Sequence, residues 1–398
     1  MRNPHEFQKV GMSEKFDFDT PENRRGTNSV KWDSESAPDI LPMWVADMDF
    51  KTAPAVVEAL KARAASGIFG YAKVPGAFYE SLINWFARRH SASVRRDWIL
   101  YTTGVVPAIS AIIRALSSPG DKVVVQEPVY NCFFSSIRNN GCEISANPLR
   151  LSGNRYEIDF EDLEKKLSDP KAKIFLLCSP HNPSGRVWTR EELRAVGELC
   201  LRHGVFVISD EIHCDLVLGG RKHTPFLSLG ERFAANSATC VSASKAFNLA
   251  GLQAADIIAP DECARAKIDR ALNVNEVCEI SPFAIDAQTA AYSGGEEWLE
   301  ALKGYLRGNF GFLSEFLDRR LPKLSALDLE ATYLPWIDCR ATGMGSEQIS
   351  RLLYEKARVR INPGTLYGKS GDGFIRINIA CPRSVLREGL ERAARALE

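Results

Sequence analysis

The sequence lacks the features that would place the protein in a membrane or outside the cell. Among its 398 residues, no apolar run approaches the roughly 18–20 residues that a membrane-spanning helix needs. The N-terminal stretch MRNPHEFQKVGMSEKFDFD has no apolar segment of the kind found in secretion signals. We therefore expect a soluble, cytoplasmic protein without a membrane partner.

Neither sign of charge is in excess, because 50 Lys and Arg residues balance 50 Asp and Glu residues. Without a global positive field, there is no electrostatic case for a nucleic-acid partner. The hydrophobic fraction of 45% and the charged fraction of 25% are ordinary for a globular chain and exclude wholesale disorder. The composition therefore predicts a folded protein that does not bind nucleic acid.

Paired cysteines are also missing. The ten cysteines lie singly, with no CxxC pair and no Cys/His cluster at zinc spacing. Cys178 and Cys240 stand in apolar runs, where a thiol behaves as a small buried hydrophobe. His213, Cys214 and Asp215 are consecutive, so they cannot all face one metal, and no partner cluster is evident. We expect structural cysteines, a reducing compartment and no metal.

Nucleotide-binding fingerprints are absent as well. No GxGxxG follows a predicted strand, and GTLYGKS (residues 364–370) has three residues between its glycines where a phosphate loop needs four. These absences argue against both dinucleotide and nucleoside triphosphate binding.

Short apolar runs do alternate with amphipathic stretches from about residue 54 onward. Predicted strands cover residues 98–101, 122–126, 174–178, 205–209, 238–241 and 256–259, and predicted helices cover 54–64, 76–90, 106–117, 130–140 and 189–203. Continuous apolar strands with helical crossovers indicate a largely parallel sheet covered on both faces. The pattern predicts an α/β fold.

The pattern changes after about residue 285. Helices are predicted at 283–293, 296–319, 345–356 and from 383, with strands at 334–339, 358–361 and 374–379. This mixture is typical of a smaller α+β domain. We predict an N-terminal arm that joins the small domain (1–50), a large domain (51–285) and a small C-terminal domain (286–398).

Polar side chains follow three of the predicted strands. Asp210 follows the run VFVIS, Asn182 lies in SPHNPSG after IFLLC, and Lys245 lies in SASKAFNLAGLQ after ATCV. Each has an ordinary alternative: a helix cap for Asp210, a turn for Asn182 and a solvated charge for Lys245. Because ligands of open α/β sheets bind at the carboxyl ends of strands, the three side chains can converge on one crevice.

Such a set suits pyridoxal 5'-phosphate (PLP). The PLP aldehyde takes a lysine amine, the pyridinium nitrogen needs a carboxylate, and the ring oxygen needs a donor such as an asparagine amide. The amides of residues 104–106, at the start of a predicted helix, can bind the phosphate. Tyr130 follows the strand 122–126 and can stack on the pyridine, although alone it would be a core aromatic.

Eight motifs then carry a specific resemblance, in order along nearly the whole chain. They are ILPMWVADMDF (40–50), GIFGY (67–71), TTGVVPA (102–108), QEPVY (126–130), SPHNPSG (179–185), SDEIHCD (209–215), SASKAFNLAGLQ (242–253) and GFIRINIACPR (373–383). The chain resembles fold-type I PLP enzymes of the class I/II aminotransferase superfamily and, within it, the MalY/PatB-type cystathionine β-lyases (C–S lyases). The resemblance implies an aspartate aminotransferase-like large domain with a mostly parallel mixed sheet, plus a smaller α+β domain.

The resemblance also implies a role for each matching cofactor residue. Lys245 would bind the cofactor aldehyde and then remove the substrate Cα proton. Asp210 would pair with the pyridinium nitrogen, and Asn182, helped by His213, would bond to the ring oxygen. The implied phosphate site consists of Gly104, Val105, Val106, Ser242 and Ser244.

Three further positions concern the substrate and the subunit interface. Arg376 would grip the substrate α-carboxylate through a bidentate fork, with Ala46 lining the same site. Tyr71 would reach the phosphate of the neighbouring subunit, which implies a homodimer with its active site at the interface. The alternatives are a solvent-facing strand arginine for Arg376 and a core aromatic for Tyr71.

One position departs from the transaminase pattern. Many transaminases of the superfamily have an arginine eight residues after the lysine, where this chain has Gln253. The loss of that charged phosphate clamp argues against an ordinary transaminase and for the lyase branch.

The resemblance therefore implies α,β-elimination from a sulfur-containing L-amino acid such as cystathionine, giving a thiol, pyruvate and ammonia. An aminotransferase on the same machinery and a non-catalytic PLP-binding regulatory protein are the alternatives. The residues that would shape a substrate side-chain pocket are scattered, so the sequence does not identify the physiological substrate.

Overall fold

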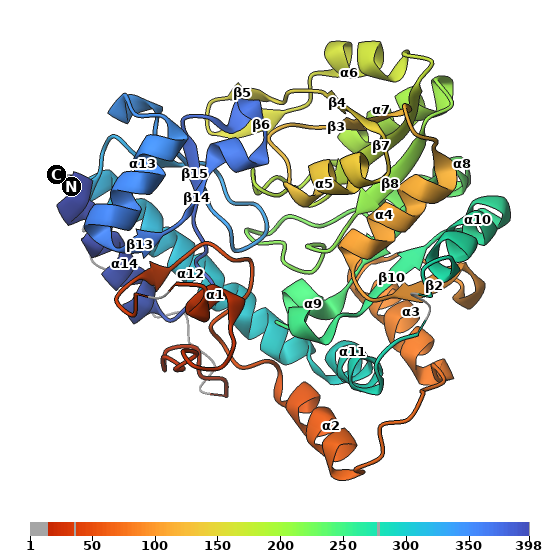
Figure 1. Cartoon of the computed structure of the whole chain (residues 1–398), viewed down its shortest axis with the longest axis horizontal. Helices are drawn as coiled ribbons and strands as arrows, with labels where there is room; N and C mark the ends of the chain where they lie inside the picture. Colours follow the sequence, from red (N-terminus) through yellow and green to blue (C-terminus); the bar gives the residue numbers. More distant parts are fainter. Residues whose placement is uncertain (1–14, 36, 277–278, 398) are drawn as a thin grey trace, which may run out of the picture.

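A computed structural model describes residues 15–35, 37–276 and 279–397 of the chain (Figure 1). Residues 1–14 of the predicted N-terminal arm, and Cys278 among the predicted structural cysteines, lie outside the described residues. Within the described part, none of the helices combines the length and apolarity that crossing a bilayer demands.

The central sheet has seven strands in the spatial order β2, β10, β9, β8, β7, β3, β4. Their bounds are β2 Ile99–Thr102, β3 Lys122–Val125, β4 Glu143–Ala146, β7 Ala172–Cys178, β8 Phe206–Asp210, β9 Ser237–Val241 and β10 Ala255–Ile258. Only β10 is antiparallel to its neighbours β2 and β9, and the remaining pairs are parallel. The predicted α/β fold with a mostly parallel mixed sheet is confirmed.

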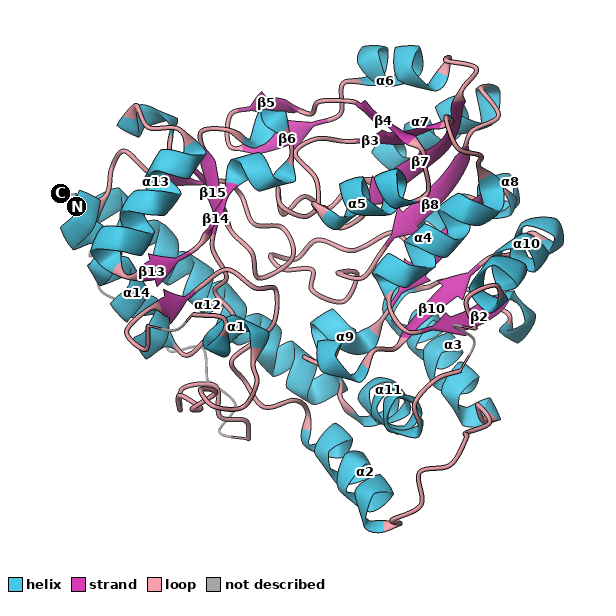
Figure 2. Cartoon of the chain, in the orientation of Figure 1, coloured by secondary structure: helices cyan, strands magenta, loops and turns pink. Residues whose placement is uncertain are grey.

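Helices cover both faces of this sheet, which explains why central strands such as β7 are largely apolar (Figure 2). Along β7, Ile174 and Leu176 join the core cluster that contains residues of α4 (Val105–Leu116), α5 (Cys132–Asn139) and α10 (Glu262–Asn273). The alternate residues Phe175 and Leu177 join the cluster on the other face, with α6 (Phe160–Leu167) and α7 (Arg190–Arg202).

A second sheet and its helices follow the long helices α11 (Pro282–Gly294) and α12 (Glu296–Arg320) in the sequence. Its four-stranded antiparallel sheet has the order β11, β12, β15, β14 and packs with the last helices. The bounds are β11 Ser325–Ala326, β12 Trp336–Asp338, β14 Asn362–Pro363, β15 Phe374–Arg376, α13 Ser346–Leu352 and α14 Arg383–Leu397. The predicted single helix over 345–356 is wrong in its second half, because a π-helical turn, Leu353–Ala357, follows α13.

The N-terminal segment pairs with this C-terminal part. β1 (Leu41–Pro42) is parallel to β13 (Val359–Arg360), so the segment around residue 41 lies beside the C-terminal part of the chain. In Figure 1, the red segment near α1 accordingly lies beside the blue elements. This pairing agrees with an arm that joins the small domain, while the domain boundaries at residues 50 and 285 stay predictions.

The remaining helices connect these parts and carry several of the residues discussed below. They are α1 Val30–Asp33, α2 Pro54–Ala65, α3 Gly76–His90, α8 Glu231–Ala235 and α9 Ala243–Ala246. The antiparallel hairpin of β5 (Arg150–Ser152) and β6 (Arg155–Glu157) lies outside the central sheet.

Candidate active site

A cavity lies where β7, β8 and β9 end, at the carboxyl edge of the central sheet. Most of the predicted site residues line it: Ala46, Gly104, Val105, Val106, Tyr130, Asn182, Asp210, His213, Ser244 and Lys245. The expected convergence of the strand ends is therefore found. Ser242, Tyr71 and Arg376 are not among the lining residues and are described separately below.

Lys245 lies on α9, a short helix that directly follows β9. The Ser242 side chain caps this helix by accepting a hydrogen bond from the backbone N–H of Ser244. The Lys245 Nζ donates to the carbonyl oxygen of Ala46 at 2.7 Å. Burial lowers the pKa of Lys245 to about 8, and the Arg376 guanidinium adds to this fall. A substantial neutral fraction at physiological pH makes this amine a nucleophile and a base.

Asp210 is the last residue of β8, and its side chain is buried. Burial raises the pKa of Asp210 to about 7, although its Oδ1 accepts from the backbone N–H of Ile212 at 3.1 Å. No cation in the described part of the chain forms an ion pair with it. A buried carboxylate of this kind fits a ligand that brings its own positive charge, such as the protonated pyridine nitrogen of PLP.

His213 lies beside this carboxylate and is also buried. Burial lowers the pKa of His213 to about 3, with contributions from the Lys245 and Arg376 charges. Its Nδ1 has no hydrogen-bond partner among the described residues. A neutral imidazole with a free polar atom at the cavity can bond to a bound cofactor.

The start of α4 also lines the cavity. Gly104 precedes the helix and contributes its first free amides together with Val105 and Val106. These amides fit an anionic phosphate group, because helix N-termini present N–H donors and a positive dipole end. A Cβ at Gly104 would lie 3.3 Å from the Cδ of Pro107, so a larger residue would crowd this turn.

The two predicted serines differ in their contacts. The Ser242 Oγ donates to the Ala254 carbonyl at 2.6 Å and also lies 2.9 Å from the Ser244 Oγ. Ser244 itself lines the cavity. In the structure Ser242 thus orients Ser244, and a direct contact of Ser242 with the phosphate stays a prediction.

Arg376, on β15, is buried with a relative exposure of 3%, so the alternative of a solvent-facing arginine is wrong. Its Nη1 donates to the Asn182 Oδ1 at 3.0 Å and its Nη2 to the Trp44 carbonyl at 2.9 Å. The Arg376 Nε atom has no hydrogen-bond partner within the described part of the chain. Because no ion pair among the described residues includes Arg376, this buried cation suits an incoming carboxylate.

Tyr130 and Tyr71 lie in contrasting surroundings. The Tyr130 ring lines the cavity and contacts Phe133 edge-on, and burial raises the pKa of its hydroxyl far above the ordinary value. Tyr71 is 96% exposed, so the alternative of a core aromatic is wrong for it. Tyr130 is therefore placed to contact a cofactor, while Tyr71 faces away from its own core.

Two further residues belong to the site, and the first of them, Tyr333, was not predicted. Tyr333 donates from its hydroxyl to the Ala46 carbonyl at 3.0 Å, the same oxygen that accepts from Lys245. No local pattern distinguishes Tyr333, because its place depends on three segments that are distant in sequence. Gln253, the departure from the transaminase pattern, lines the cavity in a left-handed backbone conformation with φ of 56°.

The expectation that no partner cluster adjoins the segment 213–215 is wrong. His90 of α3 lies beside Cys214 and Asp215, and ligand atoms of the three residues lie within 4.8 Å of one another. The Asp215 Oδ1 already bonds to the His90 Nε2 at 2.8 Å and to the Trp85 Nε1 at 2.9 Å. These bonds account for the buried carboxylate without a metal ion.

Comparisons with known proteins agree with this geometry. The family described as aminotransferase class I and II matches residues 38–393. Cystathionine beta-lyase PatB of Bacillus subtilis is 47% identical over 386 residues, which cover 96% of this chain and 100% of that protein. Protein MalY of Escherichia coli is 36% identical over 381 residues, which cover 94% and 97% of the two chains.

Solved structures give the same result. Cystalysin from Treponema denticola, which contains PLP, superposes with a TM-score of 0.93 at 34% identity, over 96% of this chain and 98% of that one. A PLP-bound C–S lyase from Staphylococcus hominis superposes with a TM-score of 0.89 at 33% identity, over 96% and 99%. The expected PLP dependence is confirmed, and the chain belongs to the aminotransferase class I and II family.

Proposed function

We propose that the protein is a PLP-dependent C–S lyase that cleaves the Cβ–S bond of a sulfur-containing L-amino acid, releasing a thiol, pyruvate and ammonia. The observation that carries this proposal is the full-length similarity to proteins named cystathionine β-lyase, of which one is 47% identical. The site supports it, because a lysine of lowered pKa and a buried arginine, which has no ion pair among the residues described, bond to the same short segment.

The residues divide the work as follows. Arg376 binds the substrate carboxylate through its fork, and Asn182 fixes the position of that fork. Bound PLP supplies an electron-withdrawing ring that stabilises negative charge at the substrate Cα. Asp210 keeps the ring nitrogen protonated, and Lys245 removes the Cα proton. The Cβ–S bond then breaks, and the leaving thiolate takes up a proton. One water molecule hydrolyses the remaining unsaturated amine to pyruvate and ammonia.

We also infer a homodimer in which Tyr71 reaches the phosphate of the partner subunit. The supporting observation is a short exposed apolar stretch, in which Ile68 is 80%, Phe69 58% and Tyr71 96% exposed. Large apolar side chains that are exposed together typically mark a protein contact. A cytoplasmic location, expected from the sequence, is likewise a proposal that cell fractionation would test.

The test is to mix the purified protein with cystathionine in the absence of any keto acid. A lyase produces pyruvate and free thiol steadily. An aminotransferase stops after one half-reaction until a keto acid is added, and a non-catalytic PLP-binding protein produces neither. A product burst that stops at one equivalent per site would overturn the lyase proposal.

A further inference from the structure

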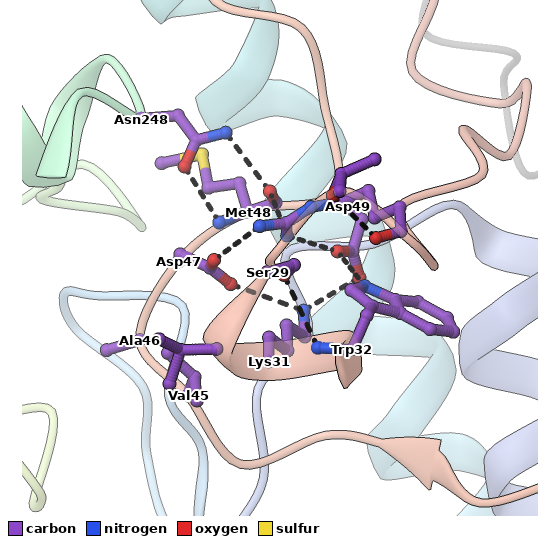
Figure 3. Close-up of polar contacts among 12 residues, drawn as sticks. Ser29, Lys31, Trp32, Val45, Ala46, Asp47, Met48, Asp49 and Asn248 are labelled. Atoms are coloured by element: carbon purple, nitrogen blue, oxygen red, sulfur yellow. Dashed lines mark hydrogen bonds and ion pairs between the residues drawn. The ribbon is translucent and has the colours of Figure 1, made fainter. Parts of the chain in front are cut away.

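The backbone of residues 45–50 is fixed from two sides by asparagine side chains, Asn248 and Asn378. Figure 3 shows Asn248 and its bonds to Met48. Asn248 accepts from the Met48 N–H at 3.0 Å and donates to the carbonyls of Met48 and Phe50 at 3.0 and 2.9 Å. From the C-terminal part, the Asn378 side chain donates to the carbonyls of Val45 and Asp47. Lys245 lies three residues before Asn248 in the sequence. The bonds of Asn248 therefore fix the position of this turn relative to Lys245.

The N-terminal arm surrounds the same turn with charge. Arg24 contacts Asp47 and Asp49, each at 2.7 Å. Lys31 contacts Asp49 at 2.7 Å and lies 3.8 Å from the Oδ1 of Asp47. Lys31 and Asp49 are 1% and 4% exposed, so these charges act on one another with little screening by water.

The other side of the turn faces the candidate active site. The Ala46 carbonyl accepts from the Lys245 Nζ at 2.7 Å and from the Tyr333 hydroxyl at 3.0 Å. The next residue is Asp47, whose Oδ1 is buried and accepts no hydrogen bond from any described residue. A single peptide bond, between Ala46 and Asp47, thus separates the carbonyl that contacts the Lys245 amine from the carboxylate that contacts Arg24 and Lys31.

The charged groups around Lys245 shift the pKa of its amine in opposite directions. Burial and the Arg376 charge lower the pKa of Lys245, whereas Asp47, Asp210 and Cys132 oppose the fall. His213 and Tyr333 also face this region, and their charged forms are disfavoured by burial. Among these groups, only Asp47 belongs to the network with Arg24 and Lys31.

We propose that Asp47 is a positioning residue for Lys245. The turn that contains Asp47 holds the Ala46 carbonyl against the amine. The Asp47 carboxylate, which also contacts Arg24 and Lys31, sets the electrostatic environment in which the amine nitrogen gains and loses its proton. The inference rests on Lys245 as the cofactor-binding lysine of the proposed function. It assigns part of the catalytic setting to Arg24 and Lys31, two residues that do not line the cavity.

The test is a pH titration of the visible absorbance of the PLP-loaded protein without substrate, which reports protonation at the Lys245 nitrogen. Asp47→Asn removes the negative charge with little change in shape, and Arg24→Gln removes a cation that compensates it. We expect the titration midpoint to fall in Asp47→Asn and to rise in Arg24→Gln, each by on the order of half a pH unit.

Two further variants separate charge from shape. Arg24→Lys keeps the cation without the guanidinium fork, so its midpoint should stay near that of the parent protein. Asp39→Asn breaks a comparable exposed pair with Arg358 and should leave the midpoint unchanged. A merely structural role for the arm predicts that Arg24→Lys and Arg24→Gln change together.

Midpoints that move in the same direction in Asp47→Asn and Arg24→Gln, or that do not move, overturn the inference. If Arg24→Gln does not fold, an unchanged midpoint in Asp47→Asn overturns it alone. The outcome is independent of the lyase proposal, because opposite shifts in a protein that releases no thiol would refute the lyase assignment and leave the role of Asp47 standing.

Discussion

Lys245 and Arg376 are held by backbone carbonyls only two residues apart. The Lys245 Nζ donates to Ala46 at 2.7 Å, and the Arg376 Nη2 donates to Trp44 at 2.9 Å. One short segment therefore fixes the distance between the amine that would take the Cα proton and the guanidinium that would bind the carboxylate. The Arg376 charge also contributes, after burial, to lowering the pKa of Lys245. Substrate placement and base strength thus depend on the same local geometry.

Replacing the lysine tests the central assignment. In Lys245→Ala, we expect the visible absorbance of covalently bound PLP to disappear and pyruvate formation to fall by about 10²–10⁴-fold, because the general base is removed. Lys61→Ala, an exposed lysine on α2, is the matched control and should behave like the parent protein. Normal turnover by Lys245→Ala would mean that another residue is the base.

The carboxylate-binding role of Arg376 predicts a specific kinetic change. Arg376→Lys keeps the charge but loses the two-pronged fork, so we expect kcat/KM to fall by about 10–100-fold, mostly through a higher KM. Steady-state rates with cystathionine measure this effect. Arg340→Lys, at an exposed pair with Asp338, is the control, and an equal loss there would contradict the assignment.

Asp256 gives a stability prediction that does not depend on the activity. Burial raises the pKa of this carboxyl from 3.8 to about 7, although Gln288 donates to it at 2.6 Å. Since the folded pKa is raised, the folded state favours the protonated form, and the related stability is full below pH 3.8 and is lost as the pH rises through about 7. Asparagine carries no charge at any of these pH values.

The stabilising effect of Asp256→Asn on the free energy of unfolding should therefore grow by on the order of 2 kcal/mol between about pH 5 and about pH 8. Urea denaturation at both pH values measures it, with Asp318→Asn, an exposed aspartate, as the control. An effect of equal size at both pH values would show that the Asp256 carboxyl is not the titrating group.

The exposed stretch at residues 68–71 predicts separate effects on assembly and on cofactor retention. Ile68→Asp places a charge in the inferred interface, so the protein should sediment as a monomer at concentrations where the parent is a dimer. Tyr71→Phe should keep the dimer but release PLP faster during dialysis. Val30→Asp, at a residue that is 67% exposed elsewhere, should change neither property. A parent protein that sediments as a monomer would refute the dimer.

The convergence of Asn182, Asp210 and Lys245 could be predicted because each follows an apolar run and parallel strands end at one edge of a sheet. The edge strand β4, Glu143–Ala146, could not, since polar and apolar residues alternate in its sequence EISA and form no apolar run. The bond between Lys245 and Ala46 joins residues 199 positions apart, and no local pattern specifies such a contact. For the same reason, neither the contact of Tyr333 nor the network of Arg24 and Asp47 could be predicted from the sequence.

The pairing of β1 with β13 has a consequence for the order in which the protein is assembled during its synthesis. Residues 41–42 leave the ribosome early, but their partners at 359–360 are made more than three hundred residues later. Likewise, the Trp44 carbonyl can accept its hydrogen bond only after Arg376, 332 residues later in the chain, has been synthesised. The central sheet can form while translation continues, whereas the segment that contains Ala46 can pack in its final position only near the end of translation. Stable capture of PLP should therefore be among the last events of biogenesis.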